Sequence, residues 1–236
     1  LNWMKASSRK RGGLIICIFS FEMPDTLRQK GQRRLLIEEL ARKYEFDPEV
    51  LKAMERVPRH LFVDKGLEHM AYKDKPLPIA ARQTISQPYT VAMQTHLLDC
   101  QKRDKVLEIG TGCGYQAAVL MAMGFHVYSI ERIRELYILA QKNLVNSGFD
   151  PSGLFYGDGF SGLSQFAPFK GILVTCGAPG IPVRLKEQLS INGKMVIPVG
   201  HNEQRMLRIT RTGQDDYKTE DFGAYQFVPM LGGIQK

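Results

Sequence analysis

Apolar runs and helical patterns alternate through the middle of this 236-residue chain. The short apolar runs predict buried strands, and the stretches between them repeat apolar residues at helical spacing. Strands that alternate with helices build a parallel sheet covered on both faces, so the pattern predicts a doubly wound α/β core. The predicted strands are residues 105–110, 126–130, 153–156, 171–176 and 194–199, and the predicted helices are residues 115–123, 133–147 and 182–190.

Three further helices are expected ahead of this core. The second begins at Asp47-Pro48-Glu49, which supplies an N-cap, a proline at the first helical position and an acid in the first turn. The third covers residues 90–100, and residues 72–79 and 83–89 are expected to be loops because prolines interrupt regular structure. The first begins near Thr26 and is expected to be amphipathic through Leu27, Leu35, Leu36, Leu40 and Ala41.

The pattern changes after Gly200. Residues 206–211 and 219–228 are strand-like and flank a polar turn, which predicts an antiparallel hairpin at the edge of the sheet. We expect one domain over residues 23–236, and residues 1–22 are expected to be an extension that can be deleted without changing stability or activity. The domain would comprise a helical and loop part at 23–100, a cofactor-binding core at 101–200 and the hairpin at 201–236.

Composition argues against several kinds of partner. The formal net charge is +8, of which +3 falls in the first 22 residues, and the mild remaining excess does not by itself indicate nucleic acid binding. The apolar run at residues 14–21 is too short to span a bilayer. The four cysteines form no C-x-x-C pair and the histidines no H-E-x-x-H helix, so we expect no metal, and free thiols in a reducing cytoplasm.

The strongest signal for a binding site is the stretch from Val106 to Tyr115, which contains the sequence E-I-G-T-G-C-G-Y. It is typical of a buried strand that runs into a glycine-rich turn and then a helix. The three turn glycines lack a Cβ, so the backbone can approach a ligand, and the helix N-terminus offers free N–H groups. Glu131 ends the next predicted strand, where a carboxylate can accept hydrogen bonds from a ribose diol.

The glycine spacing discriminates between cofactors. A dinucleotide fold requires G-x-G-x-x-G, whereas here the spacing is G-x-G-x-G and Tyr115 stands where the last glycine would be. The pattern E-x-G-x-G-x-G before a helix resembles the first motif of S-adenosylmethionine-dependent methyltransferases. That cofactor has a ribose but no pyrophosphate, and its methionine carboxylate and amine would lie against the turn. The alternative is a glycine-rich turn that binds no ligand.

Two further positions fall at the same edge of the predicted sheet. Asp158, in Gly157-Asp158-Gly159, can accept a hydrogen bond from an adenine amino group, although a plain turn aspartate is the alternative. Cys176 ends the fourth core strand and is either a nucleophile, as in enzymes that methylate pyrimidine carbon, or a buried thiol. We favour the buried thiol, because no neighbour in the sequence would lower its pKa.

From Met23 onward the chain resembles the protein-L-isoaspartate O-methyltransferases. The segment Thr84-Ile-Ser-Gln-Pro88 is its most specific part, because general methyltransferases lack it. The chain departs from the family pattern at Ala80–Arg82, Lys170, Cys176 and Asn192. The other segments that carry the resemblance are Val57–Val63, Tyr72–Asp74, Leu77–Ile79, Val106–Tyr115, Ser129–Arg132, Gly157–Gly159, Met195–Gly200 and Phe227–Leu231.

The resemblance implies a Rossmann-like class I methyltransferase fold and a protein repair activity. Methyl would pass from S-adenosyl-L-methionine to the α-carboxylate of an L-isoaspartyl residue, leaving S-adenosyl-L-homocysteine, with no metal. It also implies a monomer that acts on isoaspartyl-containing proteins and has no nucleic acid or membrane partner. Ser86 would be the catalytic residue, and the cofactor-binding residues would be Thr84, Ile85, Gln87, Glu108, Gly110, Thr111, Gly112, Gly114, Tyr115, Glu131, Asp158 and Gly159.

This chemistry needs little acid–base apparatus. A carboxylate is already ionised near neutral pH, and a sulfonium is already an activated methyl donor. The remaining work is to align the reacting atoms and to exclude water, which fits a sequence without an evident His–Asp pair. Two alternatives stay open: an RNA methyltransferase that uses Cys176 and the basic N-terminal helix, and a non-catalytic module that binds S-adenosylmethionine.

Overall fold

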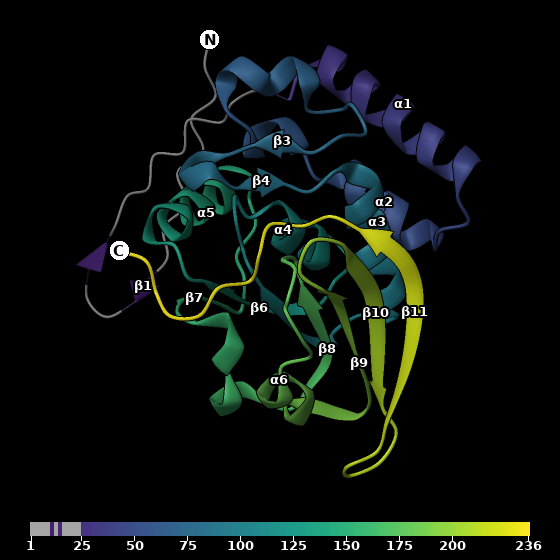
Figure 1. Ribbon diagram of the computed structural model, residues 1–236. Helices are drawn as coiled ribbons and strands as arrows, with labels where there is room; N and C mark the ends of the chain where they lie inside the picture. The colour runs from purple at the N-terminus through teal and green to yellow at the C-terminus, as the bar shows by residue number, and fades with distance from the viewer. Residues whose placement is uncertain (1–9, 12–13, 16–24) are drawn as a thin grey trace.

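The fold is organised around one twisted seven-stranded sheet, seen in the computed structural model, which describes residues 10–11, 14–15 and 25–236 (Figure 1). The strand order is β11-β10-β9-β8-β5-β6-β7. The strands from β9 to β7 are parallel, whereas β10 pairs antiparallel with both β9 and β11. Their bounds are β5 Lys105–Ile109, β6 His126–Glu131, β7 Gly153–Tyr156, β8 Phe169–Val174, β9 Leu189–Val199, β10 Gln204–Arg211 and β11 Tyr217–Tyr225.

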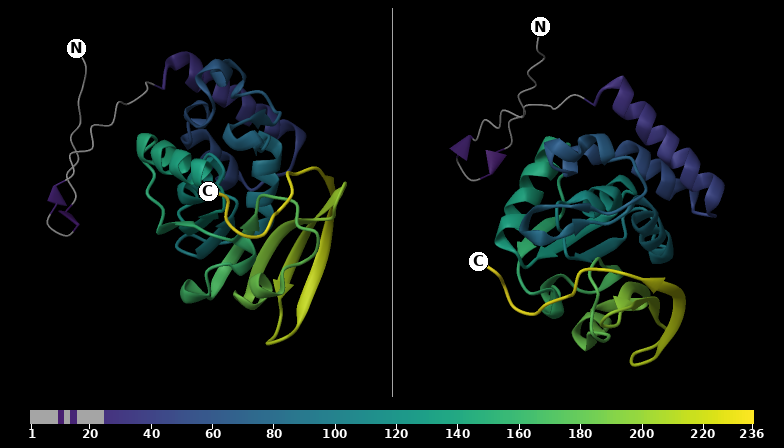
Figure 2. Two further views of the ribbon diagram at one scale, coloured as in Figure 1. Left: turned by 60° about the vertical axis from the view of Figure 1, so that its left-hand side comes forward. Right: turned by 45° about the horizontal axis from the view of Figure 1, so that its top comes forward.

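Helices cover the sheet unequally on its two faces (Figures 1 and 2). Successive residues of β5 point to opposite faces, so Val106 packs in the larger core and Leu107 in the smaller one. The larger core lies under α2 to α5, with α1 packed on α2, whereas α6 and short 3₁₀ turns cover the smaller core. The helices are α1 Leu27–Lys43, α2 Pro48–Arg56, α3 Pro88–Leu98, α4 Tyr115–Ala122, α5 Arg134–Asn146 and α6 Val183–Glu187.

The predicted doubly wound sheet with N-terminal helices and a C-terminal hairpin is confirmed. The second helix begins as the sequence predicts, because the Asp47 side chain accepts the Glu49 N–H at 2.9 Å and Pro48 is its first residue. Several boundaries differ by a few residues, and the largest difference is at β9. This strand begins at Leu189, which pairs with Phe169, and not at residue 194, so the helix expected over 182–190 ends at Glu187.

The expectation of loops over 72–79 and 83–89 was wrong in part. Strand β3 (Leu77–Pro78) pairs antiparallel with β4 (Thr84–Ile85) in a separate two-stranded sheet. The Ile79 N–H also donates to the Gln83 carbonyl at 2.9 Å and closes the turn between the two strands. A ladder of two residues uses few backbone donors, so the proline does not prevent it. This small sheet carries the Thr84–Ser86 segment toward the main sheet.

The buried face of α1 also differs from the prediction. Leu27 and Leu35 are 87% and 67% exposed, whereas Arg33, Leu36 and Leu40 are buried. Those three follow the i, i+3, i+7 spacing of one helix face, and the sequence reading missed it because the first member is a charged residue. Arg33 is tolerated there because its guanidinium donates to the Asp25 carboxylate at 2.8 Å and to the Tyr72 hydroxyl at 3.0 Å.

Near the N-terminus, β1 (Lys10–Arg11) and β2 (Leu14–Ile15) form a short antiparallel pair. Apart from these four residues, the predicted extension over 1–22 lies outside the described residues, and its division from the domain at 23–236 stays a prediction. Over the part of the chain that the structure describes, no helix has both the length and the apolar character needed to cross a membrane.

Candidate active site

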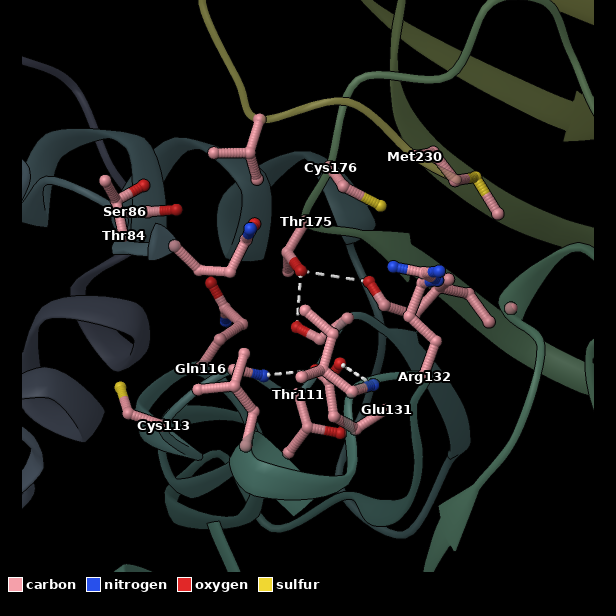
Figure 3. A pocket seen from close by; sticks show the side chains of 18 of the residues that line it. Thr84, Ser86, Thr111, Cys113, Gln116, Glu131, Arg132, Thr175, Cys176 and Met230 are labelled. Atoms are coloured by element: carbon pink, nitrogen blue, oxygen red, sulfur yellow. Dashed lines mark hydrogen bonds between the residues drawn. The ribbon is translucent and has the colours of Figure 1, made fainter. Parts of the chain in front are cut away.

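A pocket opens at the carboxyl ends of β5, β6 and β8 (Figure 3). The strand order reverses at β5, because β6 and β7 extend the sheet on one side of it and β8 and β9 extend it on the other. Such a switch point is where open α/β sheets bind ligands. Four parts of the chain meet there: the glycine turn with the start of α4, the end of β6, the end of β8, and two segments from the ends of the domain. These last two are Gln83–Ser86 and Val228–Leu231.

The glycine turn has a backbone that only glycine adopts easily. Gly110, Gly112 and Gly114 have φ angles of +92°, +56° and +93°. A Cβ on Gly110 would also lie 2.6 Å from the Thr175 hydroxyl oxygen, so this position has no room for a side chain. That hydroxyl lies 2.6 Å from the Gly110 carbonyl oxygen, to which it donates. The turn is therefore fixed against the end of β8.

Glu131 joins the turn to the end of β6. One carboxylate oxygen accepts the Gly112 N–H and the other accepts the Ile133 N–H, each at 2.9 Å. Burial raises the pKa of Glu131, while these backbone N–H groups act in the opposite direction. Each oxygen keeps a second lone pair, so the side chain can accept further hydrogen bonds from a ligand in the pocket.

Glu108 supports the turn from below, since it is fully buried in β5 and does not line the pocket. Its carboxyl group accepts a short hydrogen bond from the Ser129 hydroxyl, which lies 2.6 Å from the Thr111 hydroxyl. Because the single hydroxyl proton of Ser129 is used in the hydrogen bond to Glu108, the Thr111 hydroxyl must donate to Ser129. Burial raises the pKa of Glu108 to about 8, and the polar chain links that buried acid to the glycine turn.

Ser86 lies in the pocket on a segment that a buried arginine holds. The Arg59 guanidinium donates to the Ser86 carbonyl at 2.8 Å and to the Ala71 carbonyl at 3.0 Å. Arg59 is fully buried, stacks 4.7 Å from the centre of the Tyr115 ring, and has no acidic partner within the described part of the chain. Burial lowers its pKa. The sequence reading assigned this residue no role, although an arginine within the apolar Val57–Val63 segment was a usable signal.

The C-terminal wall of the pocket was also missed. The Gly177 N–H donates to the Val228 carbonyl at 2.8 Å, and the Met230 N–H donates to the Gly177 carbonyl at the same distance. These bonds bring residues 228–231 across the end of β8, where they line the pocket. Periodicity gave no sign of this, because the segment follows the last strand and belongs to no regular element.

The family model for protein-L-isoaspartate(D-aspartate) O-methyltransferase matches residues 30–235, nearly the whole described domain. The chain belongs to this family. A protein-L-isoaspartate O-methyltransferase from Christiangramia forsetii is 48% identical over 209 residues, which are 89% of this chain and 98% of that protein. The resemblance inferred from the sequence is therefore confirmed.

Solved structures agree with this membership. A protein-L-isoaspartate O-methyltransferase is 27% identical, with a TM-score of 0.77 over 86% of this chain and 67% of the other. A second structure, described as such an enzyme from Plasmodium falciparum in complex with S-adenosyl-L-homocysteine, is 22% identical. It shares the fold, with a TM-score of 0.75 over 84% of this chain and 98% of the other.

Most of the site residues that the family resemblance implied lie together. The four that do not line the pocket are Gln87, Glu108, Gly114 and Asp158. The Asp158 carboxylate instead accepts the Phe160 N–H at 2.9 Å and the Gly233 N–H at 2.8 Å, so its adenine contact stays a prediction. Those that line the pocket are Thr84, Ile85, Ser86, Gly110, Thr111, Gly112, Tyr115, Glu131 and Gly159.

The residues present fit S-adenosylmethionine. The glycine turn leaves open backbone beside the N-terminus of α4, and Glu131 offers a carboxylate at the end of β6. Gln116 also lines the pocket and has a buried carboxamide oxygen without a hydrogen-bond partner. Within the described ranges, no group of three or more His, Cys, Asp or Glu residues could hold a metal.

Cys176 lines the pocket beside Thr175 and is free (Figure 3). Burial raises the pKa of its thiol to about 12, and the nearby charge of Glu131 acts in the same direction. A thiol with this pKa is protonated at neutral pH, and the thiolate is the nucleophilic form. The raised pKa therefore favours an unreactive, half-buried thiol over the nucleophile.

Proposed function

We propose that this protein transfers the methyl group of S-adenosyl-L-methionine to the α-carboxylate of L-isoaspartyl residues in proteins and peptides. The observation that carries the proposal is the junction of two segments in one pocket. The glycine turn with Glu131 provides a cofactor site, and the family-specific Thr84–Ser86 segment lies against it. S-adenosyl-L-homocysteine and a methyl ester are the products.

Three groups of residues bind the three parts of the cofactor. The N–H groups at the start of α4 receive the methionine end, because those of Gly110, Thr111, Gly112 and Gly114 already donate within the protein. The positive end of the helix dipole favours the carboxylate there. Glu131 receives the ribose hydroxyls, and the Gly159 region receives the adenine. When bound, the cofactor supplies a methyl group activated by a positively charged sulfur.

The substrate carboxylate needs orientation rather than deprotonation. The hydroxyl of Ser86 donates a hydrogen bond that holds one carboxylate oxygen beside the methyl group without neutralising it. That oxygen forms the new C–O bond while the C–S electron pair returns to sulfur, so no proton has to move. No histidine is among the residues that line the pocket, and this reaction needs none.

The methyl ester makes repair of the linkage possible. The carbonyl carbon of a methyl ester is more electrophilic than that of a carboxylate and can release methanol, so the neighbouring peptide nitrogen can attack it and close a succinimide. Hydrolysis of that ring can restore a normal aspartyl bond. The enzyme's task in this scheme ends with the ester, which agrees with a site that orients a carboxylate and excludes water.

The direct test is methyl transfer to a matched pair of peptides. The full chain is incubated with S-adenosylmethionine carrying a labelled methyl group and, in separate reactions, with an isoaspartyl peptide, its aspartyl isomer or RNA. We expect base-labile label in the isoaspartyl peptide alone. Equal labelling of both peptides would remove the substrate assignment, and labelling of RNA but neither peptide would favour the RNA methyltransferase alternative.

We also propose that the protein acts as a monomer in the cytoplasm on damaged proteins, without a nucleic acid or membrane partner. The free cysteines within the described residues support a reducing compartment, and the mild positive charge gives no specific support for nucleic acid. Light scattering after size exclusion, at several protein concentrations, tests the oligomeric state. A mass near twice 26.7 kDa would contradict the monomer.

A further inference from the structure

Gln116 lies in the first turn of α4, is 7% exposed, and has a carboxamide whose orientation is fixed. One amide atom lies 2.9 Å from the Thr95 hydroxyl oxygen, and that hydroxyl lies 2.8 Å from the Val91 carbonyl. The carbonyl can only accept, so the single hydroxyl proton goes to it. The Gln116 atom beside Thr95 must then be the donor, Nε2.

This assignment leaves Oε1 of Gln116 buried with no donor. A buried acceptor without a partner is costly, so a native structure that keeps one usually has a reason for it. Gln116 also lines the pocket, and Figure 3 shows its side chain between the glycine turn and the segment with Thr84 and Ser86. The missing donor is therefore expected from a ligand in this part of the pocket.

The cofactor has few groups that can donate. They are the adenine amino group, the two ribose hydroxyls and the α-ammonium of the methionine end. Glu131 is the sole acidic residue among those that line the pocket, and it lies at the ribose end, on β6. With the methionine end bound as proposed, the ammonium would lie by the turn and α4, where Gln116 offers a side-chain oxygen.

We propose that Oε1 of Gln116 accepts a hydrogen bond from the α-ammonium of S-adenosylmethionine and of S-adenosylhomocysteine. This inference rests on the proposed function, since it uses the same pocket and cofactor. Gln116 then selects ligands that keep the amino-acid end. It should discriminate S-adenosylhomocysteine from 5′-methylthioadenosine, which has the adenine and the ribose but no ammonium.

The chain offers a matched control in Gln94 on α3. Gln94 is fully buried, and like Gln116 it has an Oε1 atom without a donor. Its Nε2 donates to the Val174 carbonyl at 2.8 Å. Gln94 does not line the pocket. A variant at Gln94 therefore measures what the loss of a buried carboxamide does to the fold, without removing an acceptor from the pocket.

The test is calorimetric binding of both ligands to the full chain and its variants, with thermal unfolding to monitor the fold. Gln116→Met keeps the volume but removes the acceptor, and we expect it to weaken S-adenosylhomocysteine binding roughly tenfold to a hundredfold, as for a hydrogen bond to a charged group. Binding of 5′-methylthioadenosine should stay within about twofold. Gln94→Met should change neither affinity, and Glu131→Ala should weaken both ligands because both have the ribose.

Each outcome decides something. If Gln116→Met weakened the binding of both ligands equally, or weakened the binding of neither, the inference would be wrong. If that variant fails to fold, Gln116→Glu replaces it: the carboxylate retains an acceptor and should preserve the preference for S-adenosylhomocysteine, and loss of the preference would overturn the inference. Failure of the unmodified protein to bind either ligand would instead overturn the proposed function.

Discussion

The pocket has two halves that are built in different ways. The cofactor half, made of the glycine turn and Glu131, stands on the neighbouring parallel strands β5 and β6 and is closed by the bond from Gly112 to Glu131. The other half, which we propose orients the substrate and call the substrate half, contains Ser86 and Val228–Leu231, which come from opposite ends of the domain. It depends on single long-range contacts, such as that from Arg59 to the Ser86 carbonyl.

The comparison shows that a functional group can be positioned by a ladder of many backbone hydrogen bonds or by a few side-chain hydrogen bonds. In the cofactor half many ladder hydrogen bonds between β5 and β6 share the task of holding the turn and Glu131 in place. In the substrate half one guanidinium holds the segment that carries Ser86. We therefore expect single substitutions far from the chemistry to disturb the substrate half more than the cofactor half.

The largest effect is expected from Arg59→Ala. The change leaves a buried and a half-buried carbonyl acceptor unpaired and creates an unfilled volume, so the unfolding free energy should fall by about 3 kcal/mol or more. Urea denaturation measures this. Methyl transfer by the remaining folded protein should fall as well, whereas S-adenosylhomocysteine affinity should change much less.

Arg33→Ala is the control for that experiment, because Arg33 is also buried but bonds to Asp25 and Tyr72 instead of the Ser86 segment. It should lower stability without lowering turnover per folded molecule. Equal loss of turnover in the two variants would show that Arg59 has no specific influence on the substrate half.

The next largest effect concerns Ser86. Ser86→Ala should lower turnover on an isoaspartyl peptide roughly a hundredfold, which is about 2.7 kcal/mol of positioning. Cofactor affinity should stay nearly constant, and histidine should contribute no bell-shaped pH dependence, because no proton is removed. Steady-state kinetics and calorimetry check both points. Full activity in the variant would show that another donor, such as a backbone N–H near Ala178, holds the substrate carboxylate.

The two halves also differ in how far the sequence predicts them. The strand, turn and helix from Val106 to Tyr115 form a contiguous pattern with one structural solution, so the fold and most of the cofactor half followed from local spacing. The role of Arg59 and the return of Val228–Leu231 to β8 depend on tertiary contacts between distant segments. Hydrophobic periodicity has no information on such contacts.

Two misreadings have the same physical origin. The α1 face was misassigned because Arg33 is buried, which its partners Asp25 and Tyr72 make possible and which no apolar pattern signals. The β3–β4 ladder was missed because a proline stands in it. In both cases a tertiary partner overrides the preference of the residue.

A pH-dependent effect is expected beneath the cofactor half. The pKa of Glu108 rises from an ordinary 4.5 to about 8 in the folded protein. Between these values the folded state retains a proton that the unfolded state has lost, so this carboxyl makes unfolding free energy fall as pH rises, by roughly 1 kcal/mol per pH unit. Glu108→Gln does not titrate, so its stability relative to the unmodified protein should rise from pH 5 to pH 8. If the urea midpoints of the variant and of the unmodified protein changed equally with pH, this prediction would be wrong.

The smallest effect is expected where the two halves meet, at Cys176. The thiol lines the pocket, but its pKa of about 12 keeps it protonated, and methylation of a carboxylate needs no protein nucleophile. Cys176→Ala should therefore keep turnover on the isoaspartyl peptide within about twofold. Cys100→Ala, which removes a thiol of similar pKa outside the pocket, controls for the loss of a half-buried sulfur. If Cys176→Ala abolished methyl transfer while Cys100→Ala did not, the sulfur would take part in the chemistry, and the division of the pocket into a cofactor half and a substrate-orienting half would fail.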